Sequence, residues 1–127
     1  ADIVLAATTS KTPLFDGNDL KPGTHVTGVG AFTPEMQEID PNTIHRARVV
    51  VDQRDAVLAE AGDIIKAEAK IDAEIGEIVN GDKPGRQNDE EITFFKSVGL
   101  AVQDAVTAAA VLKAAEEKGL GTVIQMS

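Results

Sequence analysis

The stretch ADIVLAATTS, residues 1–10, is apolar from Ile3 to Ala7 and then turns to small hydroxyl residues. A strand of a parallel sheet is covered on both faces, so its sequence is a nearly continuous apolar run. We therefore predict a buried strand at Asp2–Ala7, followed by a loop at Thr8–Thr12. No Met precedes this strand, which raises the question whether the chain is complete or the second part of a longer polypeptide.

Three more β-branched or aromatic runs predict strands. They are THVTGVG, RVVVD and ITFFKS, at Thr24–Gly30, Arg48–Asp52 and Ile92–Ser97. We expect the apolar side chains of the strands to be buried on one shared parallel sheet: Ile3, Val4, Leu5, Val26, Val49, Val50 and Val51.

Helical segments alternate with these strands. A short helix is expected at Asp40–Ala47, where Asp40 precedes Pro41 as an N-cap precedes a proline. The stretch 53–81 is expected to be helical in two or three pieces, broken at glycines. Val98–Lys118 has the clearest helical pattern, with Ser97 as a candidate N-cap, and 121–127 resembles a short strand.

Strands that alternate with helices through short glycine-containing loops indicate a parallel α/β sheet. Right-handed crossovers place the loops after Ala7, Val29 and Val51 on one edge of that sheet. Ligands of open α/β sheets bind at this carboxyl edge. The sequence thus predicts that any binding site lies where these loops meet.

Composition excludes several classes of function. The chain has 127 residues, 43% hydrophobic and 26% charged, which is typical of one globular domain. A net charge of −9 and only four aromatic residues, all Phe, argue against a nucleic-acid partner. No run approaches the roughly 20 apolar residues of a membrane span. The absence of cysteine excludes disulfides and fits a cytoplasmic protein.

The motif GVGAFT, at Gly28–Thr33, resembles a dinucleotide fingerprint only in part. Thr33 stands where a third glycine would be needed, and Pro34 follows it. These glycines are better suited to a close approach by a flat ligand or by another backbone segment. His25 and His45 are too far apart to predict a metal site and are interpreted as surface or loop residues.

Five segments, taken together, resemble the ornithine cyclodeaminase and mu-crystallin family. They are ADIVLAATTSKTPLF, KPGTHVTGVGAFTPEMQEID, RVVVDQRDAVLAEAGDI, EIGEIVNGDKPGR and EITFFKSVGLAVQDAVTA, and they cover most of the chain in the family's order. The resemblance implies that residues 1–127 are the C-terminal portion of a Rossmann domain that binds NAD or NADP. It also implies that the first βαβ unit, with its G-x-G-x-x-G loop, and a substrate and dimerisation domain lie outside this chain.

The resemblance also implies which residues contact the cofactor. They are Thr8, Thr9 and Ser10 beside the dinucleotide, Val29, Gly30, Ala31 and Phe32 near the nicotinamide, and Ser97 near its carboxamide. Two alternatives stay open from the residues themselves. The threonine hydroxyls can instead satisfy their own backbone, and Ser97 can serve only as a helix cap. Asp52, a lone carboxylate at the same edge, is interpreted as a cap for the helix that follows it.

Phe32 bears on the reaction. In the cyclodeaminase branch of the family an Asp stands at the matching position, and a Phe can neither move a proton nor orient a water. The resemblance therefore favours reduction of a small imine, such as a ketimine or pyrroline-2-carboxylate, or dehydrogenation of an amino acid. Ornithine cyclodeaminase, a lyase, and a non-catalytic NADP-binding protein remain the alternatives. The parent protein is expected to be a homodimer through the missing domain, and this chain alone to be inactive.

Overall fold

The computed structural model describes residues 1–125, and its centre is a parallel sheet of five strands in the order β1-β2-β5-β3-β4. Every strand pair in it is parallel, which confirms the predicted α/β class. The strands are β1 at Ile3–Ala6, β2 at His25–Gly28, β3 at Arg48–Val51, β4 at Ala73–Glu74 and β5 at Thr93–Lys96.

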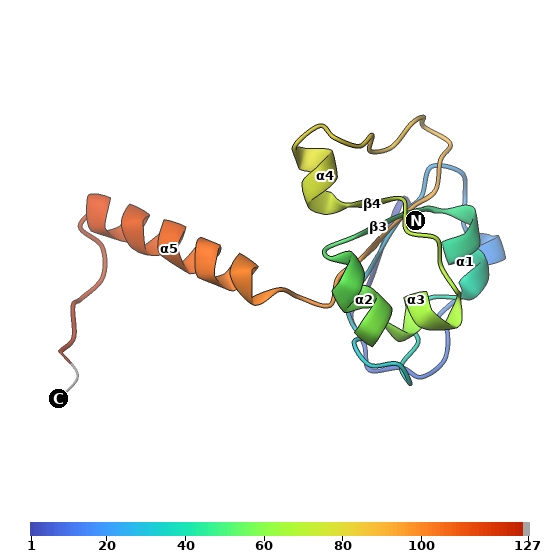
Figure 1. The fold of residues 1–127 in the computed structure, drawn as a ribbon, viewed down its shortest axis with the longest axis horizontal. Coiled ribbons are helices and arrows are strands. Elements are labelled where there is room, and N and C mark those ends of the chain that lie inside the picture. Colours follow the sequence, from blue (N-terminus) through green and yellow to red (C-terminus); the bar gives the residue numbers. More distant parts are fainter. Residues whose placement is uncertain (126–127) are drawn as a thin grey trace.

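Short helices and one long helix accompany the sheet. They are α1 at Pro41–Arg46, α2 at Arg54–Glu60, α3 at Gly62–Lys66, α4 at Ile75–Val79 and α5 at Ala101–Glu117, with a 3-10 turn at Gly17–Asp19. The predicted helical stretch 53–81 is thus three helices with β4 between them, and β4 was not predicted. In Figure 1, α1, α2 and α3 lie together beside the sheet, whereas α5 extends away from it.

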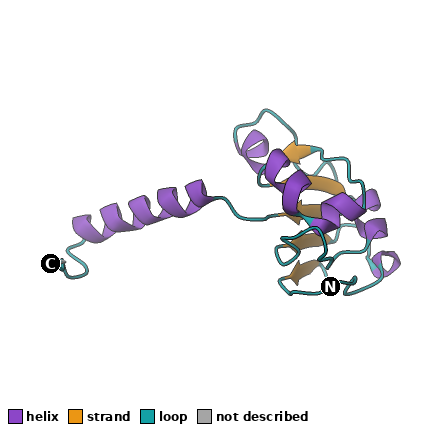
Figure 2. Cartoon of the chain, turned by 60° about the horizontal axis from the view of Figure 1, so that its bottom comes forward, coloured by secondary structure: helices purple, strands orange, loops and turns teal. Residues whose placement is uncertain are grey.

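The core lies between one face of the sheet and helices α1–α3. Side chains that alternate along the strands point to this face, and helix residues such as Ile44, Val57 and Ile64 meet them. Figure 2 shows these helices in front of the strands. The strand residues that are buried here are Ala6, Val26, Val49, Val51 and Phe94.

The opposite face of the sheet is open at β1. The expectation that Ile3 and Leu5 are buried is wrong, because they are 71% and 69% exposed. Alternate residues of a strand point to opposite faces, so Val4 and Ala6 meet the helices while Ile3 and Leu5 point away. Over β3 and β5 this face is covered in part by α4 and the loop after it, and Val50 is buried there as expected.

Helix α5 begins later than predicted and has no buried residue. Its N-cap position is Leu100, which makes no side-chain cap bond, so the interpretation of Ser97 as the cap is wrong. Residues 121–125 form no strand, and the rest of the predicted strand-like tail lies outside the described residues. Along residues 1–125, no helix combines the length and the hydrophobicity needed to cross a membrane.

Candidate functional site

The carboxyl ends of β1, β2 and β5 lie side by side. Ala6 pairs with Gly28, and Gly28 pairs with Lys96. The pairing continues beyond the strands, because Val29 N donates to Ala6 O at 2.9 Å and Ser97 N donates to Gly28 O at 3.1 Å. The three segments predicted to contain site residues, Thr8–Ser10, Val29–Phe32 and Ser97, therefore begin at the same edge of the sheet.

Two of these loops touch. Gly30 is buried, and a Cβ at this position would collide with the backbone of Thr8 and with the carboxylate of Glu38. Only glycine leaves room for the two backbones to lie this close. The structure thus supports the interpretation of this glycine as a point of close approach rather than as part of a phosphate-binding motif.

The side chain of Glu38 is completely buried and links the same two loops through hydrogen bonds. One carboxylate oxygen, Oε1, accepts a hydrogen bond from Thr8 N. The other, Oε2, accepts from Gly30 N at 2.7 Å and from Ala31 N at 3.1 Å. Sequence reasoning missed Glu38, because a single acidic residue in a loop carries no signal that distinguishes it from a solvated one.

Glu38 is held in turn by Asp63 at the start of α3. Asp63 Oδ1 accepts from the backbone N–H of Glu38 at 2.8 Å and of Ile39 at 3.0 Å. Its other oxygen, Oδ2, lies 3.3 Å from Lys96 Nζ at the end of β5, and both side chains are fully buried. A chain of buried charges therefore runs from β5 through α3 to the loops after β1 and β2.

Asp52, at the end of β3, anchors the segment that leads into α5. Its Oδ2 accepts from Ser97 Oγ at 2.8 Å and from the backbone N–H of Val98 and Gly99, both at 2.9 Å. Oδ1 accepts from Gln53 N at 2.8 Å, but the N-cap of α2 is Gln53 itself. Asp52 is thus mainly an anchor for 97–99, and the hydroxyl of Ser97 is part of that anchor.

The other residues predicted to contact the cofactor differ in how far their side chains are exposed to solvent. Thr8 and Thr9 are exposed, and Val29 and Phe32 are 38% and 47% exposed at the same edge. The hydroxyl of Thr8 accepts from Ser10 N at 3.2 Å, which is the local role that the sequence left open. Ala31 is fully buried, so it contributes through its backbone only.

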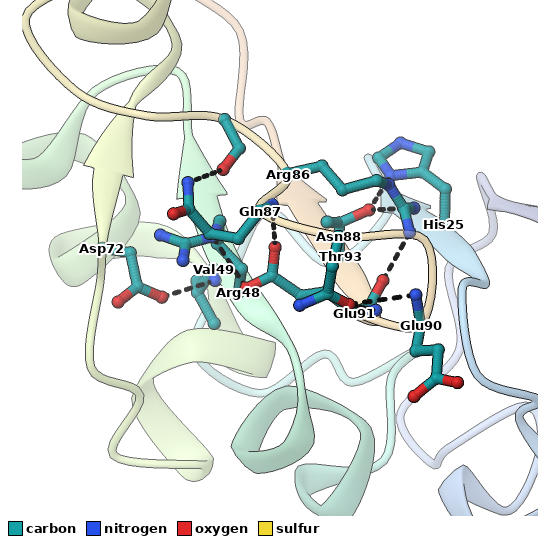
Figure 3. Close-up of polar contacts among 11 residues, drawn as sticks. His25, Arg48, Val49, Asp72, Arg86, Gln87, Asn88, Glu90, Glu91 and Thr93 are labelled. Carbon is teal, nitrogen blue, oxygen red and sulfur yellow. Dashed lines mark hydrogen bonds and ion pairs between the residues drawn. The ribbon is translucent and has the colours of Figure 1, made fainter.

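A second polar cluster lies on the open face, away from the carboxyl edge (Figure 3). His25 lies in β2 and is partly buried, which differs from the expected surface or loop position. Its ring nitrogens lie 2.7 Å from the hydroxyl oxygen of Thr93 and 3.0 Å from that of Thr27. Burial and the charge of Arg86 lower the pKa of His25.

Of the two arginines in this cluster, Arg48 is ion-paired and Arg86 donates to uncharged oxygens. Arg48 Nε donates to Glu91 Oε1 at 3.0 Å, and this bond lowers the pKa of Glu91. Arg86 Nη2 donates to Thr93 Oγ1 at 3.0 Å beside a cavity of about 460 Å³.

His45, the other histidine, lies in α1 and is exposed, with Nε2 2.7 Å from Ala67 O. Within residues 1–125, no three His, Cys, Asp or Glu side chains group as metal ligands would.

Comparison with known proteins identifies relatives over nearly the whole chain. Residues 1–119 match the ornithine cyclodeaminase/mu-crystallin family. The chain is 46% identical to Delta(1)-pyrroline-2-carboxylate reductase of Bacillus cereus, across 98% of this chain and 41% of that protein. It is 43% identical to ketimine reductase mu-crystallin of Macropus fuliginosus, across 85% of this chain and 34% of that protein.

Solved structures share the fold. Thermococcus litoralis Delta(1)-pyrroline-2-carboxylate reductase, in complex with NADH and L-proline, matches with a TM-score of 0.87 and 43% identity. That match covers 98% of this chain and 41% of the solved chain. An archaeal alanine dehydrogenase dimer with bound NAD matches with a TM-score of 0.85 and 33% identity, over 99% of this chain and 41% of that one. The chain thus spans about two fifths of the length of these relatives.

Proposed function

The chain belongs to the ornithine cyclodeaminase/mu-crystallin family, and from this premise we propose that it is the second half of a nicotinamide-dinucleotide-binding domain in an imine reductase. The substrate class is a small imine that carries a carboxylate, such as Δ1-pyrroline-2-carboxylate or a ketimine. The observation that carries this proposal is the 46% identity to a Delta(1)-pyrroline-2-carboxylate reductase across 98% of the chain.

The residues at the carboxyl edge fit a dinucleotide. The exposed side chains of Val29 and Phe32 offer an apolar wall for a flat ring, and Gly30 lets the loop that carries them pack against the loop at Thr8. Thr8 and Thr9 are exposed hydroxyl residues beside that wall. Ser97 fits less directly, since its hydroxyl donates to Asp52, and we assign it the role of fixing the 97–99 turn next to the ring.

The reduced dinucleotide, when bound, supplies the hydride for the imine carbon. In this chain, Val29 and Phe32 exclude water from that position, and the loops that Gly30 brings together orient the ring. The imine nitrogen also needs a proton. At this edge, however, the carboxylates of Glu38, Asp52 and Asp63 are buried and accept backbone hydrogen bonds. We therefore place the proton donor and the group that holds the substrate carboxylate outside this chain.

Phe32 separates reduction from cyclodeamination. Its side chain is exposed at the edge where the lyase branch of the family, by the resemblance, carries an Asp. A phenyl ring cannot exchange protons with an amine or activate water, whereas an apolar surface against the nicotinamide is compatible with hydride transfer when the proton donor lies elsewhere. This supports the reductase over the lyase.

We further infer that the whole protein is a cytoplasmic homodimer whose dimer contacts lie outside residues 1–127, and that no nucleic acid or membrane is a partner. The net charge of −9 disfavours nucleic acid, and an archaeal relative is described as a dimer. Whether NAD or NADP is used depends on the part of the site that binds the adenosine ribose, which we also place outside this chain.

A fusion tests the proposed function. The part of the Bacillus cereus reductase that lies outside its match with this chain is joined to residues 1–127, and the intact Bacillus enzyme is the positive control. Circular dichroism and gel filtration first establish that the fusion folds. We expect oxidation of NADH or NADPH that depends on Δ1-pyrroline-2-carboxylate, measured by the loss of absorbance at the nicotinamide band.

Other outcomes of this test have distinct meanings. Release of ammonia from ornithine, without net oxidation of the dinucleotide, would replace the reductase with the lyase. Binding of NADPH without turnover of either substrate would favour a binding protein. A folded fusion that neither binds nor oxidises a dinucleotide would refute the proposed function.

A further inference from the structure

We propose that Glu38 is the positioning residue of the cofactor site, and that it fixes the loops after β1 and β2 as a single wall. The role of this wall in binding a dinucleotide rests on the proposed function. The role of Glu38 in forming the wall rests only on the contacts of the chain itself. Glu38 touches no ligand-facing surface, since its side chain is completely buried.

Three backbone N–H groups from two loops converge on its carboxylate. Thr8 N donates to one oxygen, while Gly30 N and Ala31 N donate to the other at 2.7 Å and 3.1 Å. An ionised carboxylate has acceptor sites on both oxygens and no donor of its own, so it can satisfy all three groups at once. A neutral amide of the same shape has one acceptor oxygen and would direct an NH₂ group at one of the loops.

The backbone around Glu38 is also fixed. Its own N–H and that of Ile39 donate to Asp63 Oδ1, and Asp63 is paired with Lys96 at 3.3 Å. In addition, Leu14 N donates to Glu38 O at 2.8 Å and Gln37 N donates to Ser10 O at 2.9 Å. The carboxylate is therefore presented from a segment that cannot shift without disturbing both α3 and the first loop.

The burial of the charged groups of Glu38, Asp63 and Lys96 depends on the backbone N–H groups around them. Two carboxylates and one ammonium are fully buried, which leaves one uncompensated negative charge. Five backbone N–H groups point at the two carboxylates and supply the stabilisation that water would otherwise give. The two cofactor loops provide three of these five groups, so their placement and the burial of Glu38 depend on each other.

Amide hydrogen exchange on the 127-residue chain tests the first part of this proposal. In Glu38→Gln, one loop keeps its acceptor and the other faces an NH₂ group. We expect exchange at Thr8, or at Gly30 and Ala31, to accelerate about tenfold or more, the loss expected for a hydrogen bond to a charged acceptor. Exchange at Val26 and Phe94, in the core of the sheet, should accelerate less, because these amides exchange only through global unfolding.

Asp72→Asn is the matched control. Asp72 Oδ2 also accepts a backbone hydrogen bond across the fold, from Val49 N at 2.8 Å, but away from the carboxyl edge. This variant should accelerate exchange at Val49 and leave Thr8, Gly30 and Ala31 unchanged. If Glu38→Gln does not fold, Glu38→Asp replaces it, because the withdrawn carboxylate can reach only one of the two loops.

Dinucleotide binding by the fusion protein tests the second part. Glu38→Gln should raise the Kd for NADH and its KM about tenfold, while kcat at saturating NADH stays near the wild-type value, because Glu38 does not touch the reacting atoms. Asp72→Asn should leave the Kd unchanged at a temperature well below the unfolding midpoint of both variants. A Kd that rises equally in both variants would mean that only general stability had been lost, and would overturn the positioning role.

The two readouts separate this inference from the proposed function. If the wild-type fusion binds no dinucleotide but exchange accelerates as expected, the proposed function fails and the joining of the loops by Glu38 stands. If Thr8, Gly30 and Ala31 keep their wild-type exchange rates in Glu38→Gln, the inference is wrong whatever the fusion binds.

Discussion

At the scale of single residues, the carboxyl edge of this sheet is organised by buried carboxylates. Glu38, Asp52 and Asp63 each accept at least two backbone N–H groups, and the donors lie in the segments that follow the strands. Buried acceptors of this kind stabilise a loop because the N–H groups would otherwise be left without partners. The loops at this edge therefore depend on a few side chains rather than on loop-to-loop packing alone.

Gly30→Ala tests the close approach of the first two loops. The added methyl group would collide with the backbone of Thr8 and the carboxylate of Glu38, so we expect the free energy of unfolding in urea to fall by about 2 kcal/mol. Gly76→Ala, in α4, is the control, because a Cβ there meets nothing within 4 Å and alanine favours a helix. Equal stability of Gly30→Ala and wild type would show that the loops do not lie in contact.

His25 makes stability depend on pH. Burial and Arg86 lower its pKa in the folded chain, so protonation below its usual pKa of about 6.5 favours the unfolded state. The free energy of unfolding should therefore decline as pH falls from 7 toward 5. In His25→Gln, which keeps polar contacts to Thr93 and Thr27, this decline should be shallower. Urea unfolding at each pH measures both slopes, and parallel curves would exclude the histidine as the cause.

At the scale of elements, local sequence determines the strands better than the helices. The runs of Val, Ile and Phe predict β1, β2, β3 and β5 to within about two residues at each end, because apolar β-branched runs favour strands by themselves. β4 was missed because Ala73–Glu74 has no such run and pairs with β3 only through the tertiary fold. The stretch 53–81 was predicted as two or three helical pieces and contains three helices, but residues 67–74, which include β4, are not helical.

The candidate site was predictable only in outline. Parallel strands bring their following loops to one edge, so the meeting of Thr8–Ser10, Val29–Phe32 and Ser97 follows from fold class alone. The residues that hold those loops were not predictable, since Glu38 and Asp63 are far apart in sequence and resemble ordinary solvated acids. The burial of Ile3 and Leu5 was wrongly expected because coverage of a face depends on neighbours that the strand sequence does not specify.

Asp52→Ala tests the anchor of the segment before α5. The substitution removes the acceptor for Ser97 Oγ and for the N–H groups of Val98 and Gly99, so stability should fall by about 2 kcal/mol. Residues 101–117 should remain helical, but NMR relaxation should report larger-amplitude motion of the helix relative to the sheet. Asp82→Ala, in an exposed loop, is the control. A variant that matches the control in both measurements would remove Asp52 from this role.

At the scale of the whole molecule, the chain is asymmetric. One face of the sheet is packed against α1–α3, while β1 leaves apolar side chains exposed on the other and α5 has no buried residue. Both features accord with a chain that spans about 41% of the length of its reductase relatives. Contiguous exposed apolar surface is typical of sites that contact other proteins or ligands.

The 127-residue chain by itself should bind a dinucleotide weakly. It has one wall of the proposed site, but its sequence contains no G-x-G-x-x-G loop to hold the pyrophosphate at a helix N-terminus. Calorimetric titration with NADH should therefore give no binding in the micromolar range, whereas the fusion described above should bind. Micromolar binding by the chain alone would show that the edge loops are sufficient without a phosphate site.

The attachment of α5 has a mechanical consequence. Its 17 residues, at 1.5 Å each, make a rod about 25 Å long, so a rotation of about 10° at its base moves its tip by about 4 Å. Residues 97–100 join this helix to the sheet, and Asp52 at the end of β3 accepts hydrogen bonds from Ser97 Oγ and Gly99 N beside the proposed nicotinamide wall. The base of this helix therefore lies next to the proposed cofactor site. A small change at residues 97–99 on cofactor binding would produce a larger displacement at the far end of α5, and of any group in contact with that end.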